Sequence, residues 1–209
     1  MRTLVLLLLS TGTLAADPVI TLDYSGGLTP ERIRKEPYLA IYADGTIRAC
    51  NPFTKDKPRE DRMSKEAVKK LAAELAPKLQ QLKKYPGKTP AIVDASTTEM
   101  RVGKKSAKQY ALGYLAQQLP KNKQIQTLWS AQKRLDRIYN VTMVGGEKKA
   151  KKHLATANKA LKKEWPKAKP FTFDEMAAFR WSVTFRRQEG KRWIVVTCKD
   201  GKVHVDKGS

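Results

Sequence analysis

The chain has 209 residues, of which 41% are hydrophobic, and its formal net charge is +22. This length fits one large domain or two small ones, and the apolar content argues against a chain that is disordered throughout. The positive charge favours anionic partners such as nucleic acid, acidic polysaccharide or lipid headgroups.

Residues 1–16 have the pattern of a secretory signal peptide. Arg2 gives a short positive start, residues 4–9 are entirely apolar, and Ala15 and Ala16 are small residues suited to cleavage. The apolar run is much shorter than the roughly 20 residues that span a bilayer, although an uncleaved membrane anchor is the alternative. We therefore expect an exported protein, periplasmic or extracellular, whose mature chain covers residues 17–209.

The first part of the mature chain predicts a small antiparallel sheet. Residues 19–24 form a strand pattern, and residues 37–50 predict a tight hairpin in which the Asp44-Gly45 dipeptide is typical of a type I′ turn. The charged, proline-bearing segment 51–61 is interpreted as a surface loop. Ser64 is a suitable N-cap for an amphipathic helix that Pro77 should kink or break near Ala76.

Two more strands and a second helix complete this part. Residues 91–94 and 97–102 are strand-like, and apolar residues at helical spacing predict a helix from about residue 122 to residue 139. Val144-Gly145-Gly146 is the best candidate for a linker. We therefore place an N-terminal α+β domain at residues 17–143 and a C-terminal domain of one helix and three strands at residues 144–209.

The C-terminal part begins with a strongly basic helix. Ala150, Leu154, Ala157 and Leu161 form a narrow apolar stripe at helical spacing. Most of the remaining positions carry the candidate anion-binding residues, which are Lys148, Lys149, Lys151, Lys152, Lys159, Lys162 and Lys163. A solvated helix face that binds nothing is the alternative interpretation of these lysines.

A short capped turn and three strands follow this helix. Thr172 and Glu175 have capping-box spacing, with Met176 and Phe179 expected to point inward. The strands cover about residues 181–185, 192–198 and 203–205, and Asp200-Gly201 turns the chain between the last two.

The last hairpin gives a test of the nearby cysteine and histidine. If Asp200-Gly201 is a two-residue loop, Cys198 faces Val203 and Thr197 faces His204. Alternation along the strands then places Cys198 and His204 on opposite faces of the sheet. This register argues against a Cys/His metal pair and against a Cys/His nucleophilic dyad.

The mature chain contains two cysteines, Cys50 and Cys198. In an oxidising compartment an even pair is most simply a disulfide, and this one would tie the first hairpin to the last. Two buried free thiols, or a metal site, are the alternatives.

No catalytic constellation is recognisable in the sequence. Asp23 and Asp94 lie beside strand-like segments, and they would serve a hydrolase only if folding brought them into one cleft. His153 lies among lysines, whose positive charge disfavours its protonation. The sequence therefore predicts no catalytic residue, no metal site and no cofactor.

Two resemblances rest on short stretches. The pattern Pro37-x-Leu39-x-Ile41-Tyr42-Ala43-Asp44-Gly45, with Gly26-Gly27 upstream and Val93-Asp94 and Thr97-Thr98 downstream, resembles a group of uncharacterised exported bacterial proteins over about residues 19–140. This resemblance implies no activity. The C-terminal helix and strand meander is similar to cystatin-like and PepSY-like modules, which implies binding or inhibition.

These observations together predict an α+β fold. We expect antiparallel β-hairpins each followed by an amphipathic helix, and then a C-terminal helix packed on a three-stranded antiparallel meander. The expected function is that of an exported, non-catalytic binding protein, with an anionic polymer, a membrane surface or another exported protein as its partner. A carboxylate-dependent hydrolase and a structural cell-envelope protein are the alternatives.

Overall fold

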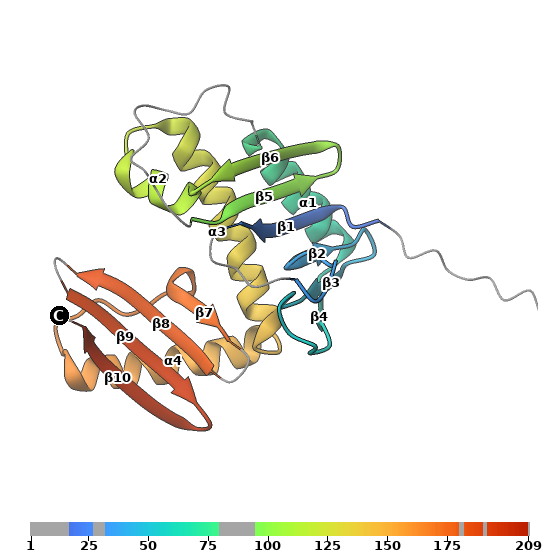
Figure 1. Ribbon diagram of the computed structural model, residues 1–209. Coiled ribbons are helices and arrows are strands. Elements are labelled where there is room, and N and C mark those ends of the chain that lie inside the picture. The colour runs from blue at the N-terminus through green and yellow to red at the C-terminus, as the bar shows by residue number, and fades with distance from the viewer. Residues whose placement is uncertain (1–16, 27–31, 80–94, 180–181, 190–191, 209) are drawn as a thin grey trace, which may run out of the picture.

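A computed structural model of the protein contains two antiparallel sheets with helices packed against them (Figure 1). It describes residues 17–26, 32–79, 95–179, 182–189 and 192–208. The predicted α+β class with antiparallel strands is confirmed. The proposed signal peptide and the predicted strand at residues 91–94 lie outside the described residues.

The first sheet has six strands in the order β4-β3-β2-β1-β5-β6, and every neighbouring pair is antiparallel. Ile20 and Leu22 of β1 are fully buried, and so are their partners Ile41 and Leu39. The alternate residues point to the other face, where Asp23 meets Arg32. The strands are β1 (Ile20–Ser25), β2 (Leu39–Ile41), β3 (Thr46–Ala49), β4 (Arg59–Arg62), β5 (Thr97–Val102) and β6 (Lys105–Tyr110).

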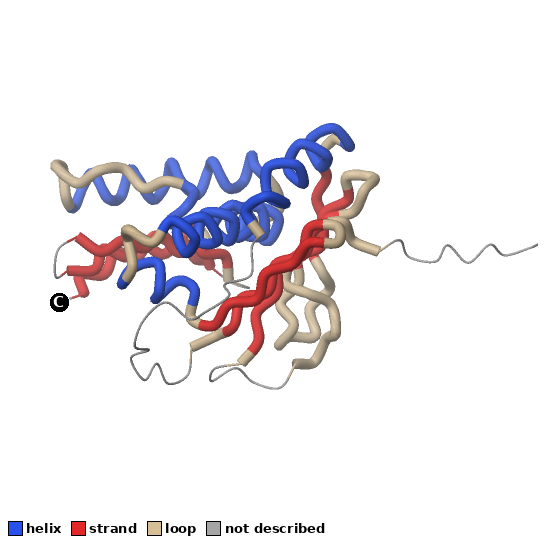
Figure 2. The backbone as a smooth tube through the Cα atoms, turned by 90° about the horizontal axis from the view of Figure 1, so that it is seen from above, coloured by secondary structure: helices blue, strands red, loops and turns tan. Residues whose placement is uncertain are grey.

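Three helices cover the apolar face of this sheet, and Figure 2 shows them on one side of it. Ser64 caps the first, because its Oγ accepts the Ala67 N–H at 3.1 Å, and Asn122 Oδ1 caps the third through the Ile125 N–H. The break predicted near Ala76 is present, since the α-helix gives way there to a 3-10 turn. The elements are α1 (Lys65–Leu75), η1 (Ala76–Lys78), α2 (Leu112–Gln118) and α3 (Lys123–Met143).

The second sheet has four strands in the order β10-β9-β8-β7. One helix, α4, contacts β8, β9 and β10, and the core between them contains Phe185, Val196 and Leu161. The meander is one strand longer than predicted. Its elements are α4 (Glu147–Glu164), η2 (Phe173–Glu175), β7 (Met176–Ala178), β8 (Ser182–Glu189), β9 (Arg192–Lys199) and β10 (Lys202–Gly208).

Helix α3 connects the two sheets (Figure 1). It packs on β1, β3 and β4, and its last turns contact β7 and η2. Asn140 makes the joint specific, because its Nδ2 donates to the Met176 carbonyl and its Oδ1 accepts the Ala178 N–H, each at 2.9 Å. The edge of β7 is thereby hydrogen-bonded to a helix that belongs to the first core.

The two Asp-Gly turns differ. Asp200 and Gly201 both have positive φ, at 49° and 74°, and Lys199 pairs with Lys202, so this loop is the expected two-residue turn. The predicted pairing of Thr197 with His204 is confirmed.

At the first hairpin the predicted type I′ turn is wrong. Tyr42 and Thr46 close a three-residue loop, in which Gly45 alone has positive φ, at 95°. The Gly45 carbonyl accepts the Met63 N–H at 2.9 Å, and a Cβ at Gly45 would overlap the Met63 carbonyl oxygen.

Two further expectations are corrected. Residues 59–61 lie within the predicted surface loop 51–61, but with Arg62 they form strand β4, because their backbone pairs with β3 although all four side chains are charged. The capping box of Thr172 and Glu175 is present. Met176 is buried but begins β7, and Phe179 is 62% exposed rather than inward.

Candidate functional site

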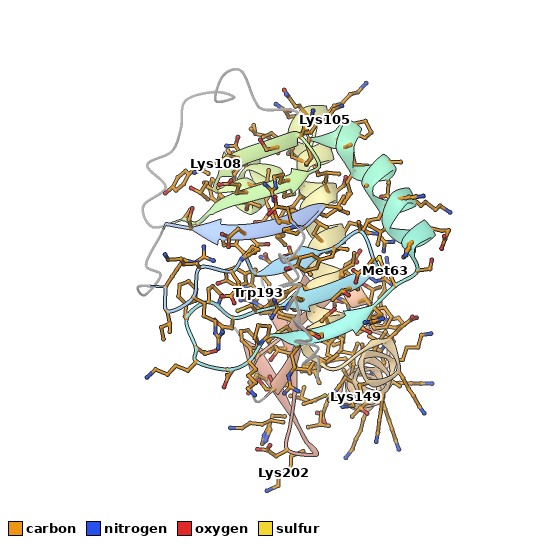
Figure 3. The ribbon with its side chains drawn as sticks, turned by 90° about the vertical axis from the view of Figure 1, so that its right-hand side faces the viewer. Met63, Lys105, Lys108, Lys149, Trp193 and Lys202 are labelled. Carbon is orange, nitrogen blue, oxygen red and sulfur yellow. The ribbon has the colours of Figure 1, made fainter. Side chains whose placement is uncertain are left out.

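The seven candidate lysines of α4 are all exposed. At 100° per residue they occupy one arc of roughly 160° of the helix circumference, opposite the buried Ala150, Ala157 and Leu161. Figure 3 looks nearly along α4, and its side chains fan outward around the labelled Lys149. Small residues on the buried side let the helix lie close to the sheet, and they leave the lysine side entirely to solvent. We call this surface the α4 lysine face.

Local electrostatics on α4 follow from this crowding of positive charge. Glu147 Oε1 forms an ion pair with Lys151 Nζ at 2.8 Å, and this contact lowers the pKa of the Glu147 carboxyl. The pKa of His153 is lowered, first by burial and then by Lys152 and Lys149. The expectation that positive charge disfavours protonation of His153 therefore holds, although burial is the larger cause.

The predicted disulfide between Cys50 and Cys198 is not formed. Both thiols are free and buried, and burial raises the pKa of each. Cys50 follows β3 in the first sheet, where its N–H donates to the Tyr38 carbonyl, whereas Cys198 belongs to the core beneath α4. The prediction rested on the compartment and on an even count of cysteines, neither of which carries information about distance.

The hydrolase alternative required Asp23 and Asp94 in one cleft. Asp94 lies outside the described residues. Asp23 forms an ion pair with Arg32 at 2.7 Å. Its side chain lies on the face of the first sheet opposite the helices, because neighbouring residues of a strand point to opposite faces and the adjacent Tyr24 points to the helix side.

A cavity of about 790 Å³ lies where the two sheets meet. It is lined by the loop that leads from β3 to β4, by one side of α3 and by the stretch from η2 to Phe179, together with Tyr24 of β1 and Tyr38, which precedes β2. Its walls are rich in aromatic rings, with Tyr38 at the centre of an edge-to-face cluster. The Tyr38 centroid lies 5.1 Å from that of Tyr24, 5.7 Å from Tyr139 and 6.1 Å from Phe53.

The carboxylate of Asp136 lines this cavity and is held by an oriented network. The Tyr24 hydroxyl donates to Asp136 Oδ1, and Gln132 Nε2 donates both to Asp136 Oδ2 at 3.3 Å and to the Tyr24 oxygen at 3.0 Å. The Thr98 hydroxyl donates to Gln132 Oε1 at 3.1 Å and so turns the amide NH₂ of Gln132 toward the acid. Each oxygen of Asp136 keeps a lone pair for another donor.

Burial raises the pKa of Asp136 to about 6, against the opposing effects of its hydrogen bonds to Tyr24 and Gln132 and of the nearby Lys133. The pKa of Tyr24 is also raised, by burial first and then by the charge of Asp136. No ion pair to Asp136 is formed by any residue that the structure describes. The cavity thus holds a buried carboxylate that forms no ion pair with a described residue, although Lys133 lies near enough to lower its pKa.

Sequence reasoning missed Asp136, Gln132 and Tyr24 as a group. One signal was present in the predicted helix, because Gln132 and Asp136 are spaced by four residues and flank the buried Leu128 and Leu135. Polar side chains at the margin of an apolar stripe often serve a buried network. No local pattern indicates that Tyr24, 112 residues before Asp136, completes the network.

Comparisons with protein-family models, with curated proteins and with solved structures find no match to this chain. In the part of the chain that the structure describes, no helix is long and apolar enough to cross a bilayer. The same described residues contain no group of three or more His, Cys, Asp or Glu side chains arranged to hold a metal ion.

Proposed function

We propose that this chain is an exported, non-catalytic binding protein that holds an acidic polymer along the α4 lysine face. The observation that carries the proposal is the confinement of seven exposed lysines to one side of an 18-residue helix. Such a helix is about 27 Å long, so it can follow several repeat units of a linear polyanion.

The charge balance of α4 supports this function. Seven lysines face only Glu147 and Glu164 on the helix, and Glu147 is already engaged by Lys151. Uncompensated cations on one surface attract polyanions and release their counterions on contact, and this release makes the affinity fall steeply with salt. Export is part of the same proposal and rests on the residues before Asp17. The protein recovered from its native envelope or medium should therefore begin at Asp17.

The test is binding of residues 17–209 to single-stranded DNA and to an acidic polysaccharide across a salt series. The variant Lys148→Gln, Lys149→Gln, Lys151→Gln, Lys152→Gln should bind at least about tenfold more weakly at low salt. Its log–log salt slope should be flatter, because each lysine that contacts a single-stranded nucleic acid contributes about 0.7 to that slope.

The matched control changes four exposed lysines elsewhere, as Lys65→Gln, Lys69→Gln, Lys70→Gln, Lys104→Gln. It removes the same charge from α1 and from the turn between β5 and β6, and it should keep most of the affinity. Equal weakening in the two variants would show a response to net charge rather than to α4. Tight binding to anionic vesicles, with no binding to either polymer, would contradict an acidic polymer as the partner and indicate a membrane surface instead.

A further inference from the structure

Among the described residues, none from α4 lines the cavity between the sheets, so the cavity is separate from the α4 lysine face. Its volume of about 790 Å³ lies within the range of small-molecule sites, which is about 300 to 1,000 Å³. Its walls come from both sheets and from α3, and Asn140 bonds the two sides together through β7. The walls are therefore held in place by the fold itself.

The carboxylate of Asp136 sets the chemistry of one end. It is held by Tyr24 and Gln132, it has no ion-pair partner among the described residues, and the rings of Tyr24, Tyr38 and Tyr139 lie close by. Aromatic faces together with an uncompensated carboxylate attract an ammonium group, because both present negative potential.

The remaining charged groups of the cavity are mostly of the opposite sign. Lys57, Arg59 and Lys133 line it and are exposed, while Arg137 stacks on Phe173 with its guanidinium carbon 4.8 Å from the ring centroid. Two other carboxylates, Asp56 and Asp174, also line the cavity. A simple cation would be repelled by the exposed cations, and a simple anion would be repelled by Asp136.

We propose that this cavity binds a zwitterionic small molecule, with its ammonium group against Asp136 and its anionic group beside Lys57 and Arg59. A ligand that carries both charges can place its cation against Asp136 and its anion beside the exposed cations of the cavity. The aromatic walls would cover the apolar part between the charges and the methyl groups of a quaternary ammonium.

The direct test is calorimetric titration of residues 17–209 with trimethylammonio carboxylates that have one to four methylene groups between the charges. Choline serves as the cation without an anion, and acetate as the anion without a cation. At least one zwitterion should bind at least about tenfold more tightly than choline, and acetate should not bind. Absence of binding across the series, or equal binding of choline, would overturn the proposal.

Variants locate the two ends of the ligand. Asp136→Asn should weaken zwitterion binding at least about tenfold, because a buried ammonium loses its counter-charge. Asp174→Asn removes an exposed carboxylate from the same cavity and should change the affinity less than threefold. Lys57→Gln with Arg59→Gln should weaken binding of the zwitterion and strengthen binding of choline, because two cations that repel choline are removed. Equal losses in the two aspartate variants would place the ammonium elsewhere and contradict the assignment.

A measurement on the unaltered protein covers the case in which Asp136→Asn does not fold. Binding should be about tenfold weaker at pH 5 than at pH 7.5, because protonation of a carboxyl with pKa about 6 removes the charge that the ammonium needs. The carboxylate of the ligand stays ionised over this range. An affinity that is constant with pH would exclude Asp136 as the counter-ion. The four-lysine variant of α4 should bind the zwitterion normally, which separates this site from the proposed polymer surface.

Discussion

The two sheets are covered by helices of different construction. On the six-stranded sheet, α1 and α3 insert branched side chains such as Leu71, Leu75, Leu128 and Leu135. On the four-stranded sheet, the fully enclosed residues of α4 are two alanines and Leu161. The bulk of the second core therefore comes from the strands and the connecting loop. The first core is spread over many residues, and the second depends on a few large ones.

The largest effect should come from Phe185, which is fully buried and whose ring centroid lies 5.7 Å from that of Phe171. Phe185→Ala should cost about 3 to 5 kcal/mol, because α4 offers little side-chain volume to fill the space. Hydrogen exchange should show the loss in β8 and β9 and leave β1 and β5 nearly as protected as before. Equal loss in both sheets would mean that the two cores unfold together.

The Asp-Gly turns offer one matched pair across the sheets. Gly45→Ala should cost about 2 to 4 kcal/mol, because a positive φ is combined with overlap against the Met63 carbonyl. Gly201→Ala meets nothing within 4 Å and should cost only about 1 to 2 kcal/mol of backbone strain. Urea denaturation of both variants measures the difference. Similar costs would show that the contact with Met63 is unimportant.

Asp136 makes the stability of the first core depend on pH. Its folded pKa of about 6 exceeds the unfolded value near 3.9, so the folded state takes up the proton first as the pH falls. Relative to Asp136→Asn, the wild type should gain up to about 3 kcal/mol of stability between pH 7.5 and pH 4. Denaturation of both proteins at several pH values checks this sign. Parallel stability curves would refute it.

A small effect should come from the joint between the sheets. Asn140→Ala leaves the Met176 carbonyl and the Ala178 N–H without their partner and should cost about 1 to 3 kcal/mol. Amides of β7 should lose protection first, and the affinity of the cavity for a zwitterion should fall with them. Asn158→Ala, which removes a comparable pair of bonds to Phe171 within the second unit, should spare zwitterion binding. A loss of zwitterion binding in both variants would contradict the conclusion that Asn140 joins the two sides of the cavity.

Features that depend on neighbours in the sequence were predictable. The register of the last hairpin followed from one two-residue turn and strict alternation, and the start of α1 followed from Ser64. The first hairpin is present, but its turn type was mispredicted because the turn contacts Met63, which lies 18 residues beyond Gly45. Strand β4 was missed because its side chains are all charged, and its strand character comes from the backbone of β3.

The candidate sites divide in the same way. Helical periodicity alone places the lysines of α4 on one side, since a single helix determines their arrangement. The cavity requires β1, α3 and η2 to meet, and no local pattern reports that meeting. An even number of cysteines likewise indicates nothing about whether Cys50 and Cys198 approach one another.

Strand β4 also affects how copies of this protein behave together. It is an edge strand of the six-stranded sheet, so no other described strand pairs with the backbone groups along its outer side. A bare strand edge invites a second molecule to extend the sheet, and charged side chains oppose that by requiring burial of their charge. The Arg-Glu-Asp-Arg sequence of β4 should therefore keep this edge from polymerising in a concentrated solution.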